Sequence, residues 1–296
     1  MAIGVLIEGR PGTGKSYSIK GLNPEETLVI STQKPILPFR KKYEVVKAST
    51  GQAVVENMLN TDKRVIVVDD LQFILGVPMM ERIGEKGWDK FNEIQQPYAD
   101  VLNTLNDLPD EDIVFFTSHT ETDENGLTKI KTIGKALDKY ISIEGLFMIV
   151  LGTQVVDDKY YFVTQNNGAN TLKSPEGMFP SKYIPNDMGY VVEKIRNYYY
   201  MEGAVSDEDI KKTDELYTVN TEEVEKPKRR GRRAKREEAV KEETVKEEPK
   251  TGGIVIEEPE KEEPKPVEEE GGSLDGYEPE PKLEEKPKRR RRRVRN

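Results

Sequence analysis

Hydrophobic residues in the first two hundred positions gather in short runs, and stretches with helical spacing lie between these runs. Most runs do not alternate with polar residues, which is typical of strands covered on both faces of a sheet. Because strands and helices alternate, the pattern predicts an α/β fold with a mostly parallel sheet and helices on both faces. The expected strands are Ile3–Ile7, Thr27–Ser31, Tyr43–Val46, Val65–Val68, Ile113–Thr117 and Leu146–Leu151. The expected helices are Ser16–Leu22, Gln52–Leu59 and Trp88–Leu105.

The pattern changes in the last quarter of this region. Two apolar stretches, Met148–Val156 and Tyr160–Thr164, flank the turn Asp157-Asp158-Lys159. Such a turn between two apolar stretches predicts an antiparallel hairpin, which we place at an edge of the sheet. A last helix is expected over Asn186–Tyr200.

The composition breaks sharply near residue 200. Charged residues make up 49 of the first 200 positions and 52 of the remaining 96, and only two of the 22 aromatic residues, Tyr217 and Tyr277, lie beyond residue 200. A segment with so little apolar surface cannot offset the roughly 1–2 kcal/mol per residue that ordering a chain costs. We therefore expect one folded domain over residues 1–200 and a disordered charged tail over residues 201–296.

Absent residue types exclude several function classes. The chain has no Cys and a single His, which excludes disulfides, thiolate zinc sites, Cys nucleophiles and His-based metal clusters. No apolar run approaches the roughly 18 residues that a membrane span requires. We expect a soluble, cytoplasmic protein without membrane partners.

A glycine-rich segment matches the phosphate-binding pattern G-x-x-x-x-G-K-[ST], and it lies directly after a predicted strand and before a predicted helix. The glycines let the loop wrap closely, so that backbone N–H groups converge on a polyphosphate. Lys15 adds a catalytic cation for the β and γ phosphates, and the Ser16 hydroxyl is a ligand for magnesium. The expected nucleotide-binding residues are Gly9, Arg10, Pro11, Gly12, Thr13, Gly14, Lys15, Ser16 and Tyr17.

Two acids follow the buried strand Val65–Val68. Parallel α/β sheets present their ligands at the carboxyl ends of the strands. Asp69 is therefore the expected magnesium ligand of the Walker B type. Asp70 is a candidate catalytic residue that polarises the attacking water, and its alternative is a solvated loop acid or a helix cap. Rival residues for positioning the water are Glu81, Glu121 and Gln33.

The strand Ile113–Thr117 is also followed by polar residues, Ser118 and His119. A strand beside the Walker B strand can aim such a group at the γ-phosphate and report its loss on hydrolysis. His119 is therefore expected to act as a catalytic-site sensor rather than as a general base. The alternative is a structural, hydrogen-bonding His.

Across roughly residues 3–200, the chain resembles phage-encoded RecA-like P-loop ATPases of the Sak-type single-strand annealing or recombinase group. Gly9–Ser16 and Val65–Asp70 carry the general part of this resemblance. The more specific strings are Glu85–Phe91, Thr117–His119, Lys131–Lys135, Glu144–Phe147 and Lys173–Phe179. The resemblance implies a RecA-like core, ATP with magnesium as cofactors, a homo-oligomer, and action on single-stranded DNA in phage recombination or replication inside the bacterial host. Phage replication or single-strand-binding proteins are further candidate partners.

One departure from RecA-like proteins concerns the catalytic Glu that usually follows the strand beside the P-loop strand. Here Thr27–Thr32 is followed by Gln33 and Lys34. Either Asp70 takes over that role or ATP turnover is slow. The resemblance also suggests that Lys131 and the candidate catalytic Lys135 reach the γ-phosphate of a neighbouring subunit, which would make hydrolysis depend on assembly. The alternative is a pair of solvated loop lysines.

The tail contains two basic blocks, residues 226–236 and 286–295, each with eight basic side chains. The first contains Arg-Gly-Arg flanked by cations and resembles an arm that enters the DNA minor groove. The second is expected to bind phosphates without sequence preference. Alternatively, both blocks only solubilise the chain or fold back on the acidic stretch between them.

Three functions remain open from the sequence. The first is an ATP-hydrolysing protein that binds single-stranded DNA and promotes annealing or strand exchange. The second is a nucleotide-dependent helicase loader or adaptor, in which ATP changes a protein interface. The third is a P-loop kinase, which usually clusters several arginines around the transferred phosphoryl group. The scattered arginines of the first 200 residues argue against the kinase; they are Arg10, Arg40, Arg64, Arg82 and Arg196.

Overall fold

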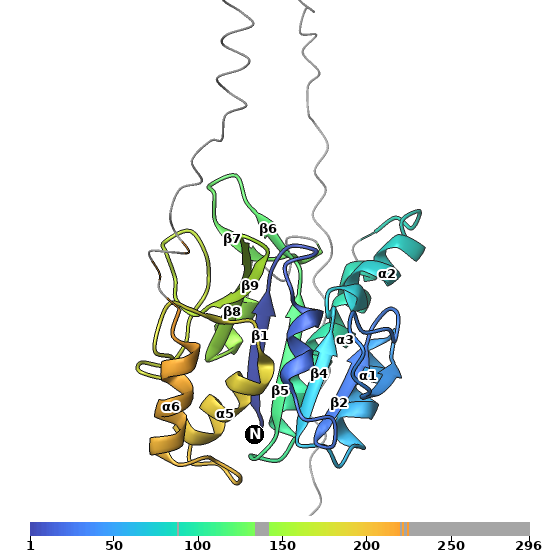
Figure 1. Ribbon diagram of the computed structural model, residues 1–296. Coiled ribbons are helices and arrows are strands. Elements are labelled where there is room, and N and C mark those ends of the chain that lie inside the picture. The colour runs from blue at the N-terminus through green and yellow to red at the C-terminus, as the bar shows by residue number, and fades with distance from the viewer. Residues whose placement is uncertain (88, 134–141, 220, 222–223, 225–296) are drawn as a thin grey trace, which may run out of the picture. The chain divides into compact units, whose positions relative to one another are not determined.

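An eight-stranded sheet forms the centre of the computed structural model (Figure 1). The structure describes residues 1–87, 89–133, 142–219, 221 and 224, which all belong to the first of two units of the chain, Met1–Arg229. The strands of the sheet are β1 (Ile3–Glu8), β2 (Thr27–Ser31), β3 (Glu44–Lys47), β4 (Val65–Asp69), β5 (Ile113–Ser118), β8 (Ile149–Val156), β9 (Lys159–Val163) and β10 (Tyr183–Pro185).

The strands lie in the order β10-β9-β8-β1-β5-β4-β2-β3. The six strands from β8 to β3 are parallel, whereas β9 pairs antiparallel with both β8 and β10. Strand β5 lies between β1 and β4, so the strand before the glycine-rich loop is separated from the strand that ends in Asp69. The expected α/β fold with a mostly parallel sheet is confirmed. Its consequence is that the carboxyl ends of β1, β5 and β4 meet at one edge.

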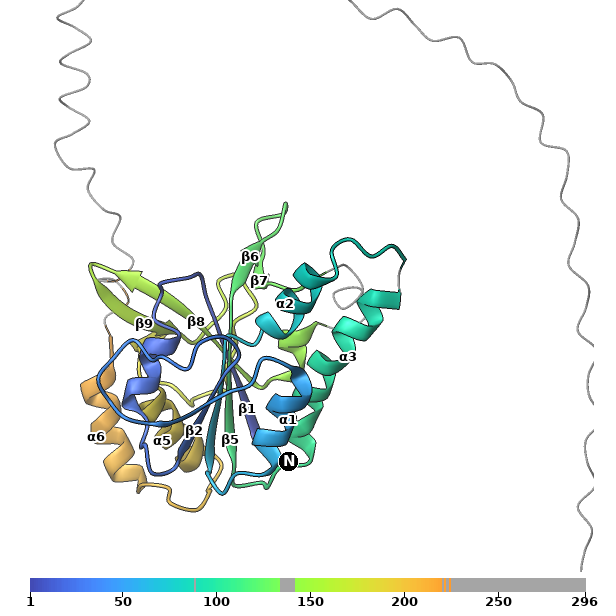
Figure 2. The same ribbon diagram turned by 90° about the vertical axis from the view of Figure 1, so that its right-hand side faces the viewer.

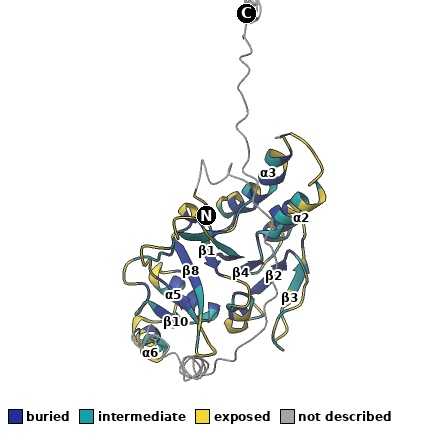
Figure 3. Cartoon of the chain, turned by 90° about the horizontal axis from the view of Figure 1, so that it is seen from above, coloured by how far each residue is buried: buried dark blue, intermediate teal, exposed yellow. Residues whose placement is uncertain are grey.

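Helices cover both faces of this sheet (Figure 2). One face carries α1 (Gly51–Leu59), α2 (Phe73–Glu81) and α3 (Asp89–Asn103), followed by the short 3-10 helices η2 (Thr104–Asn106) and η3 (Ile143–Leu146). The other face carries the 3-10 helix η1 (Ser16–Gly21), α5 (Met188–Tyr198) and α6 (Asp207–Tyr217). Leu6 packs in the first core, and its neighbours Val5 and Ile7 pack in the second. Figure 3 shows the resulting burial of the central strands between the two layers.

The predicted elements differ from the observed ones at several places. The helix expected over Ser16–Leu22 is the six-residue 3-10 helix η1, which ends where Leu22 adopts an extended conformation before Asn23 and Pro24. Helix α2 lies in a segment for which the sequence pattern predicted no helix or strand, and it contains Pro78. Strands β6 (Thr120–Thr122) and β7 (Thr128–Ile130) form a two-stranded hairpin that was not predicted because each strand has only three residues.

The predicted hairpin at the end of the sheet is confirmed. Strands β8 and β9 pair antiparallel through a two-residue turn in which Asp157 and Asp158 have φ values of 48° and 63°. Such left-handed pairs match the twist of the flanking strands. The expected position at the sheet edge is wrong by one strand, because β10 pairs with the outer side of β9.

The folded part of the chain extends past the boundary expected at residue 200. Helix α6 begins after the capping residue Ser206 and packs on α5. Tyr217 stacks on Tyr190 with ring centroids 4.5 Å apart, and Lys194 bonds Asp214 at 2.7 Å. Residues 201–217 therefore belong to the fold rather than to the tail. The two basic blocks, 226–236 and 286–295, lie outside the described residues.

Candidate functional site

The glycine-rich loop begins where β1 ends, and two of its glycines have positive φ values. Gly12 has φ of 78° and Gly14 has φ of 103°, conformations that side chains disfavour. A Cβ atom on Gly14 would also lie 2.7 Å from the ring of Tyr160 and 3.0 Å from the amide of Asn186. The loop can follow this path only with glycine at these positions.

Lys15 lies folded back inside the loop. Its side chain is buried, and Nζ donates hydrogen bonds to the carbonyls of Gly9 at 2.9 Å and Arg10 at 3.1 Å. Burial lowers the pKa of Lys15, and the nearby carboxylates of Asp70 and Asp69 act in the opposite direction. An ammonium group held by carbonyls alone is available to an anionic ligand at small cost, because ion–phosphate bonds are stronger than bonds to neutral acceptors.

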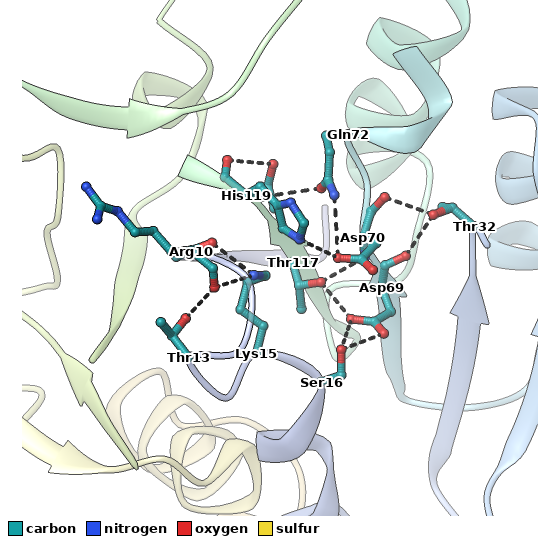
Figure 4. Close-up of polar contacts among 12 residues, drawn as sticks. Arg10, Thr13, Lys15, Ser16, Thr32, Asp69, Asp70, Gln72, Thr117 and His119 are labelled. Atoms are coloured by element: carbon teal, nitrogen blue, oxygen red, sulfur yellow. Dashed lines mark hydrogen bonds and ion pairs between the residues drawn. The ribbon is translucent and has the colours of Figure 1, made fainter. Parts of the chain in front are cut away.

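Asp69 ends β4 and is joined to the loop through hydroxyl groups (Figure 4). The Ser16 hydroxyl lies 2.9 and 3.1 Å from the two carboxylate oxygens of Asp69, and Thr117 of β5 donates to Oδ1 at 2.7 Å. Burial and the charge of Asp70 raise the pKa of Asp69, while the two hydroxyls oppose this shift. A carboxylate paired with a serine hydroxyl is an oxygen-only donor set, which fits magnesium.

Asp70 occupies a different environment from Asp69, although the two are adjacent. Its φ of 61° is left-handed, and Thr117 Oγ1 accepts a hydrogen bond from its N–H group at 2.8 Å. This turn places its carboxylate 3.4 Å from His119 Nε2. Gln72 connects the two residues, since its amide nitrogen lies 3.5 Å from Asp70 and its amide oxygen accepts from the His119 N–H at 3.3 Å. Burial and the charge of Lys15 lower the pKa of His119, so that the ring is neutral at pH 7.

These groups face one pocket of about 510 Å³. Its polar side contains Lys15, Ser16, Asp70 and His119. Its apolar side is formed by Tyr17, Pro38 and Tyr160. The rings of Tyr17 and Tyr160 lie 5.5 Å apart and are tilted by 33°. One end of the pocket is therefore cationic and lined by glycines, and the other end is aromatic.

The other loop residues that were expected to bind the nucleotide face two different sides of the loop. Pro11, Gly12 and Gly14 line the pocket together with Lys15 and Ser16. Gly9, Arg10 and Thr13 line a second pocket behind the loop. The Arg10 side chain is exposed, and in Figure 4 it extends away from Asp69 and Asp70.

The alternative candidates for positioning the attacking water do not line this pocket. The described residues that line the pocket do not include Glu81, Glu121 or Gln33. Lys135 lies outside the described residues, and Lys131 bonds to the His119 carbonyl through its backbone N–H at 2.7 Å. Lys131 is close enough for its charge to contribute to the lowered pKa of His119.

Sequence reasoning missed several residues of the site. Gln72 and Thr32 are polar residues next to a strand end, and Thr32 donates to the carbonyls of both Asp69 and Asp70. Tyr160 and Asn186 come from segments more than 140 residues away along the chain, so no local signal reveals them. Both side-chain polar atoms of Asn186 are buried without a hydrogen-bond partner beside Gly14. An orphaned amide of this kind is the one unexplained polar group in the described site.

Comparisons with known proteins do not identify a family for this chain. No family model matches the chain, and no curated protein matches it. Among solved structures, the chain is similar to one described as the structure of a DnaB-like replicative helicase and its interactions with primase, with a TM-score of 0.37 and 12% sequence identity. The similarity covers 54% of this chain and 52% of that chain, so it spans about half the length of the helicase chain. Among the described helices, none has the length and apolar character needed to span a membrane.

Proposed function

We propose that the chain binds ATP with magnesium in the pocket around Lys15 and hydrolyses it. The observation that carries this proposal is the contact between Ser16 of the loop and both carboxylate oxygens of Asp69 at the end of β4. The contact brings the two halves of a phosphate and magnesium site together from residues 53 positions apart. Lys15 lies in the same pocket, where it would exchange the loop carbonyls for phosphate oxygens.

Ser16 and Asp69 suit magnesium as the few protein ligands of an ion that is otherwise bound by phosphates and water. The described residues hold no group of three or more His, Cys, Asp and Glu side chains that could bind a metal alone. Magnesium usually takes one or two protein ligands and completes its shell with phosphates and water. Ser16 and Asp69 would supply these ligands, and the ion would neutralise charge on the β and γ phosphates.

Asp70 and His119 would act at the γ-phosphate end. Asp70 is held by the Thr117 contact in a left-handed conformation that turns its carboxylate into the pocket. There it would orient the attacking water and accept its proton. His119, neutral and 3.4 Å from Asp70, would sense the γ-phosphate and transmit its loss to the segment that follows β5.

The aromatic end of the pocket would take the base. Tyr17 and Tyr160 each expose somewhat more than a third of their surface, and a flat base can stack between them or against Pro38. The unpartnered amide of Asn186 is buried beside Gly14 and Tyr160 and does not line this pocket, so we assign it no contact with the base.

For the cellular role, we propose a phage protein of the Sak-type recombinase group that binds single-stranded DNA as an oligomer in the bacterial cytoplasm. The RecA-like strand order supports this proposal, and so do the two basic blocks of the sequence. A helicase loader or adaptor is the second candidate. A kinase is disfavoured by the arginines, because Arg64, Arg82 and Arg196 are held in ion pairs with Asp112, Glu85 and Glu26.

Titration calorimetry with ATP and magnesium tests the nucleotide site. We expect the parent to bind and Lys15→Ala to lose at least tenfold in affinity, whereas Lys211→Ala, a change at an exposed lysine of α6, keeps the parent affinity. Asp70→Asn should bind ATP normally and turn it over at least tenfold more slowly. Equal heats for the parent and Lys15→Ala would refute the site.

Turnover assays separate the cellular roles. Phosphate release that rises with single-stranded DNA and with protein concentration favours the oligomeric DNA-binding protein. Stimulation only by a partner protein favours the adaptor, and phosphoryl transfer to a second substrate favours the kinase. Lys135→Ala should lower turnover without weakening ATP binding if Lys135 acts on a neighbouring subunit.

A further inference from the structure

A second pocket, of about 550 Å³, lies directly behind the glycine-rich loop. Gly9, Arg10 and Thr13 line it, whereas Gly12, Gly14 and Lys15 face the first pocket. The loop is therefore a shared wall between two pockets. Thr13 is within hydrogen-bond distance of Thr153 on β8, so the back of the loop is fixed to the sheet beneath the second pocket.

A buried carboxyl group lies in the lining of this second pocket. Glu8, the last residue of β1, is 2% exposed, and its carboxyl group accepts a hydrogen bond from the Thr171 hydroxyl at 3.4 Å. Among the described residues, no cation forms an ion pair with it. Burial, and to a lesser degree the charge of Glu144, raise the pKa of Glu8 to about 8. At pH 7 the group is mostly a neutral acid, which donates one hydrogen bond and accepts others.

The rest of the lining mixes apolar residues, such as Val155, Val163 and Leu172, with polar ones, and it carries positive charge. Hydroxyls and amides come from the β6–β7 hairpin, from β8 and from the loop after β9; they are Thr120, Thr128, Thr153, Gln154, Asn167 and Asn170. Two cations, Arg10 and Lys182, line the same pocket, and Arg10 is exposed. With Glu8 neutral, a cationic side chain from another molecule would meet only like charge. An anionic ligand with a polar, uncharged body fits better.

We propose that this second pocket binds one nucleotide unit of a single strand, with an unstacked base against Glu8 and Gln154 and its phosphate against Arg10 and Lys182. The proposal rests on the proposed DNA-binding function and assigns that function a place in the fold. Base edges present mixed donors and acceptors, which amides and a neutral carboxyl can pair with. The volume lies within the range of known small-ligand sites. The β6–β7 hairpin, which projects beyond the carboxyl ends of the central strands in Figures 1 and 2, forms one wall.

Because the two pockets share the loop as a wall, a ligand in the second pocket would affect ATP turnover in the first. The Gly9 and Arg10 carbonyls that hold Lys15 belong to the residues that line the second pocket. A nucleotide unit against Arg10 and Thr13 would shift these carbonyls and so change how readily Lys15 turns to the γ-phosphate. Occupancy by a strand would in this way stimulate turnover without contact between DNA and ATP.

The binding test uses the full chain, a fluorescent single-stranded oligonucleotide and a saturating non-hydrolysable ATP analogue, which fills the first pocket. Turnover is measured separately, with ATP in place of the analogue and with or without the oligonucleotide. Gln154→Leu should weaken oligonucleotide binding about five- to tenfold and reduce the stimulation of turnover by DNA, because one base contact is lost. Turnover without DNA should stay at the parent value. Gln52→Leu, at an exposed glutamine of α1, is the matched control and should behave as the parent does.

A pH series tests the role of Glu8 in the same pocket. A purely structural effect of the Gln154 substitution would not produce such a pH dependence. The parent should lose oligonucleotide affinity as the pH rises through about 8, because ionised Glu8 repels the strand and no longer donates. Glu8→Gln should abolish this pH dependence. The other charged groups around Glu8, namely Glu144, Arg10 and Lys182, are unchanged in the variant, so the difference isolates Glu8.

The outcomes separate the inference from the proposed function. If the parent binds DNA but both variants match it at every pH, the inference is overturned and the DNA-binding function stands. If the parent binds no oligonucleotide, the DNA-binding function and the inference both fail, while the ATP site is judged by its own titration. Thymidine monophosphate serves as a probe for a free nucleotide. If its binding depends on Gln154 while binding of the oligonucleotide does not, the ligand of the pocket is a free nucleotide rather than a strand, and the inference is overturned.

Discussion

At the scale of single residues, the adjacent acids Asp69 and Asp70 show how position decides chemistry. Asp69 ends a buried strand and receives hydroxyl donors from Ser16 and Thr117, which stabilise its charge against burial. Asp70 is turned by its left-handed backbone toward His119. One residue type therefore serves as the candidate metal ligand and, one position later, as the candidate base.

Thr117 joins these two acids, since its hydroxyl contacts both the Asp69 carboxylate and the Asp70 N–H group. Thr117→Val should lower the free energy of unfolding by about 1–3 kcal/mol, because two buried polar groups lose their partner. Urea unfolding measures this effect. Thr122→Val, in the exposed β6 strand, is the control and should change stability by less than about 0.5 kcal/mol.

The buried acid Glu8 should make stability depend on pH. Its folded pKa of about 8 lies above its ordinary value of 4.5, so its contribution is fully present below pH 4.5 and is lost as the pH rises toward 8. We expect the stability of the parent to fall relative to that of Glu8→Gln by on the order of 1 kcal/mol per pH unit in this window. Urea unfolding of both proteins across the window measures the difference, and parallel curves would contradict the raised pKa.

At the scale of elements, the glycine-rich loop is specified by backbone conformation and by the space beside it. Gly12 and Gly14 both have positive φ, but only Gly14 lies against other side chains. Gly12→Ala should cost about 1–2 kcal/mol of stability from backbone strain alone. Gly14→Ala should cost more and should also weaken ATP binding more than tenfold, because Tyr160 and Asn186 must move. Thermal unfolding and calorimetry on both variants check this, and equal losses would contradict it.

Helix α6 is the element that the charge pattern concealed. Its sequence is strongly charged, yet Tyr217 stacks on Tyr190 of α5 and Asp214 bonds Lys194. One aromatic residue, the buried Ile210 and a few polar contacts hold this capped helix on a folded neighbour, which composition averaged over many residues cannot show.

Tyr217→Ala should therefore destabilise the fold by about 1–2 kcal/mol through loss of the stacked pair. The adjacent Leu216 is 82% exposed, so Leu216→Ala is a matched control with little expected effect. Chemical denaturation compares the two variants. Equal stabilities would mean that α6 does not pack on α5 in solution.

At the scale of the whole molecule, the parallel sheet brings the ends of β1, β5 and β4 to one edge and places a pocket on either side of the loop that leaves β1. Two ligands can then communicate through a few loop atoms. This arrangement needs no large movement of the sheet, whose central strands are fully buried.

The basic blocks of the tail can be tested separately from this body. Because α6 belongs to the fold, the deletion should remove residues 226–296 rather than all residues after 200. We expect unchanged ATP affinity, weaker DNA binding and a shallower dependence of that binding on salt, since fewer phosphates are neutralised. Fluorescence anisotropy at several salt concentrations measures the slope. An unchanged slope would exclude the tail from DNA contact.

The sequence by itself determined the features that depend on neighbouring residues. The central parallel strands, the glycine-rich loop and the two acids at the end of β4 each follow from local pattern, because strand burial and phosphate binding impose fixed spacings. Only the tertiary structure decided which distant groups meet. Tyr160 and Asn186 lie beside Gly14, and Thr171 bonds Glu8, because strands far apart in the chain pair in the sheet. Local pattern carries no information on such contacts, since they arise from the strand order and not from spacing.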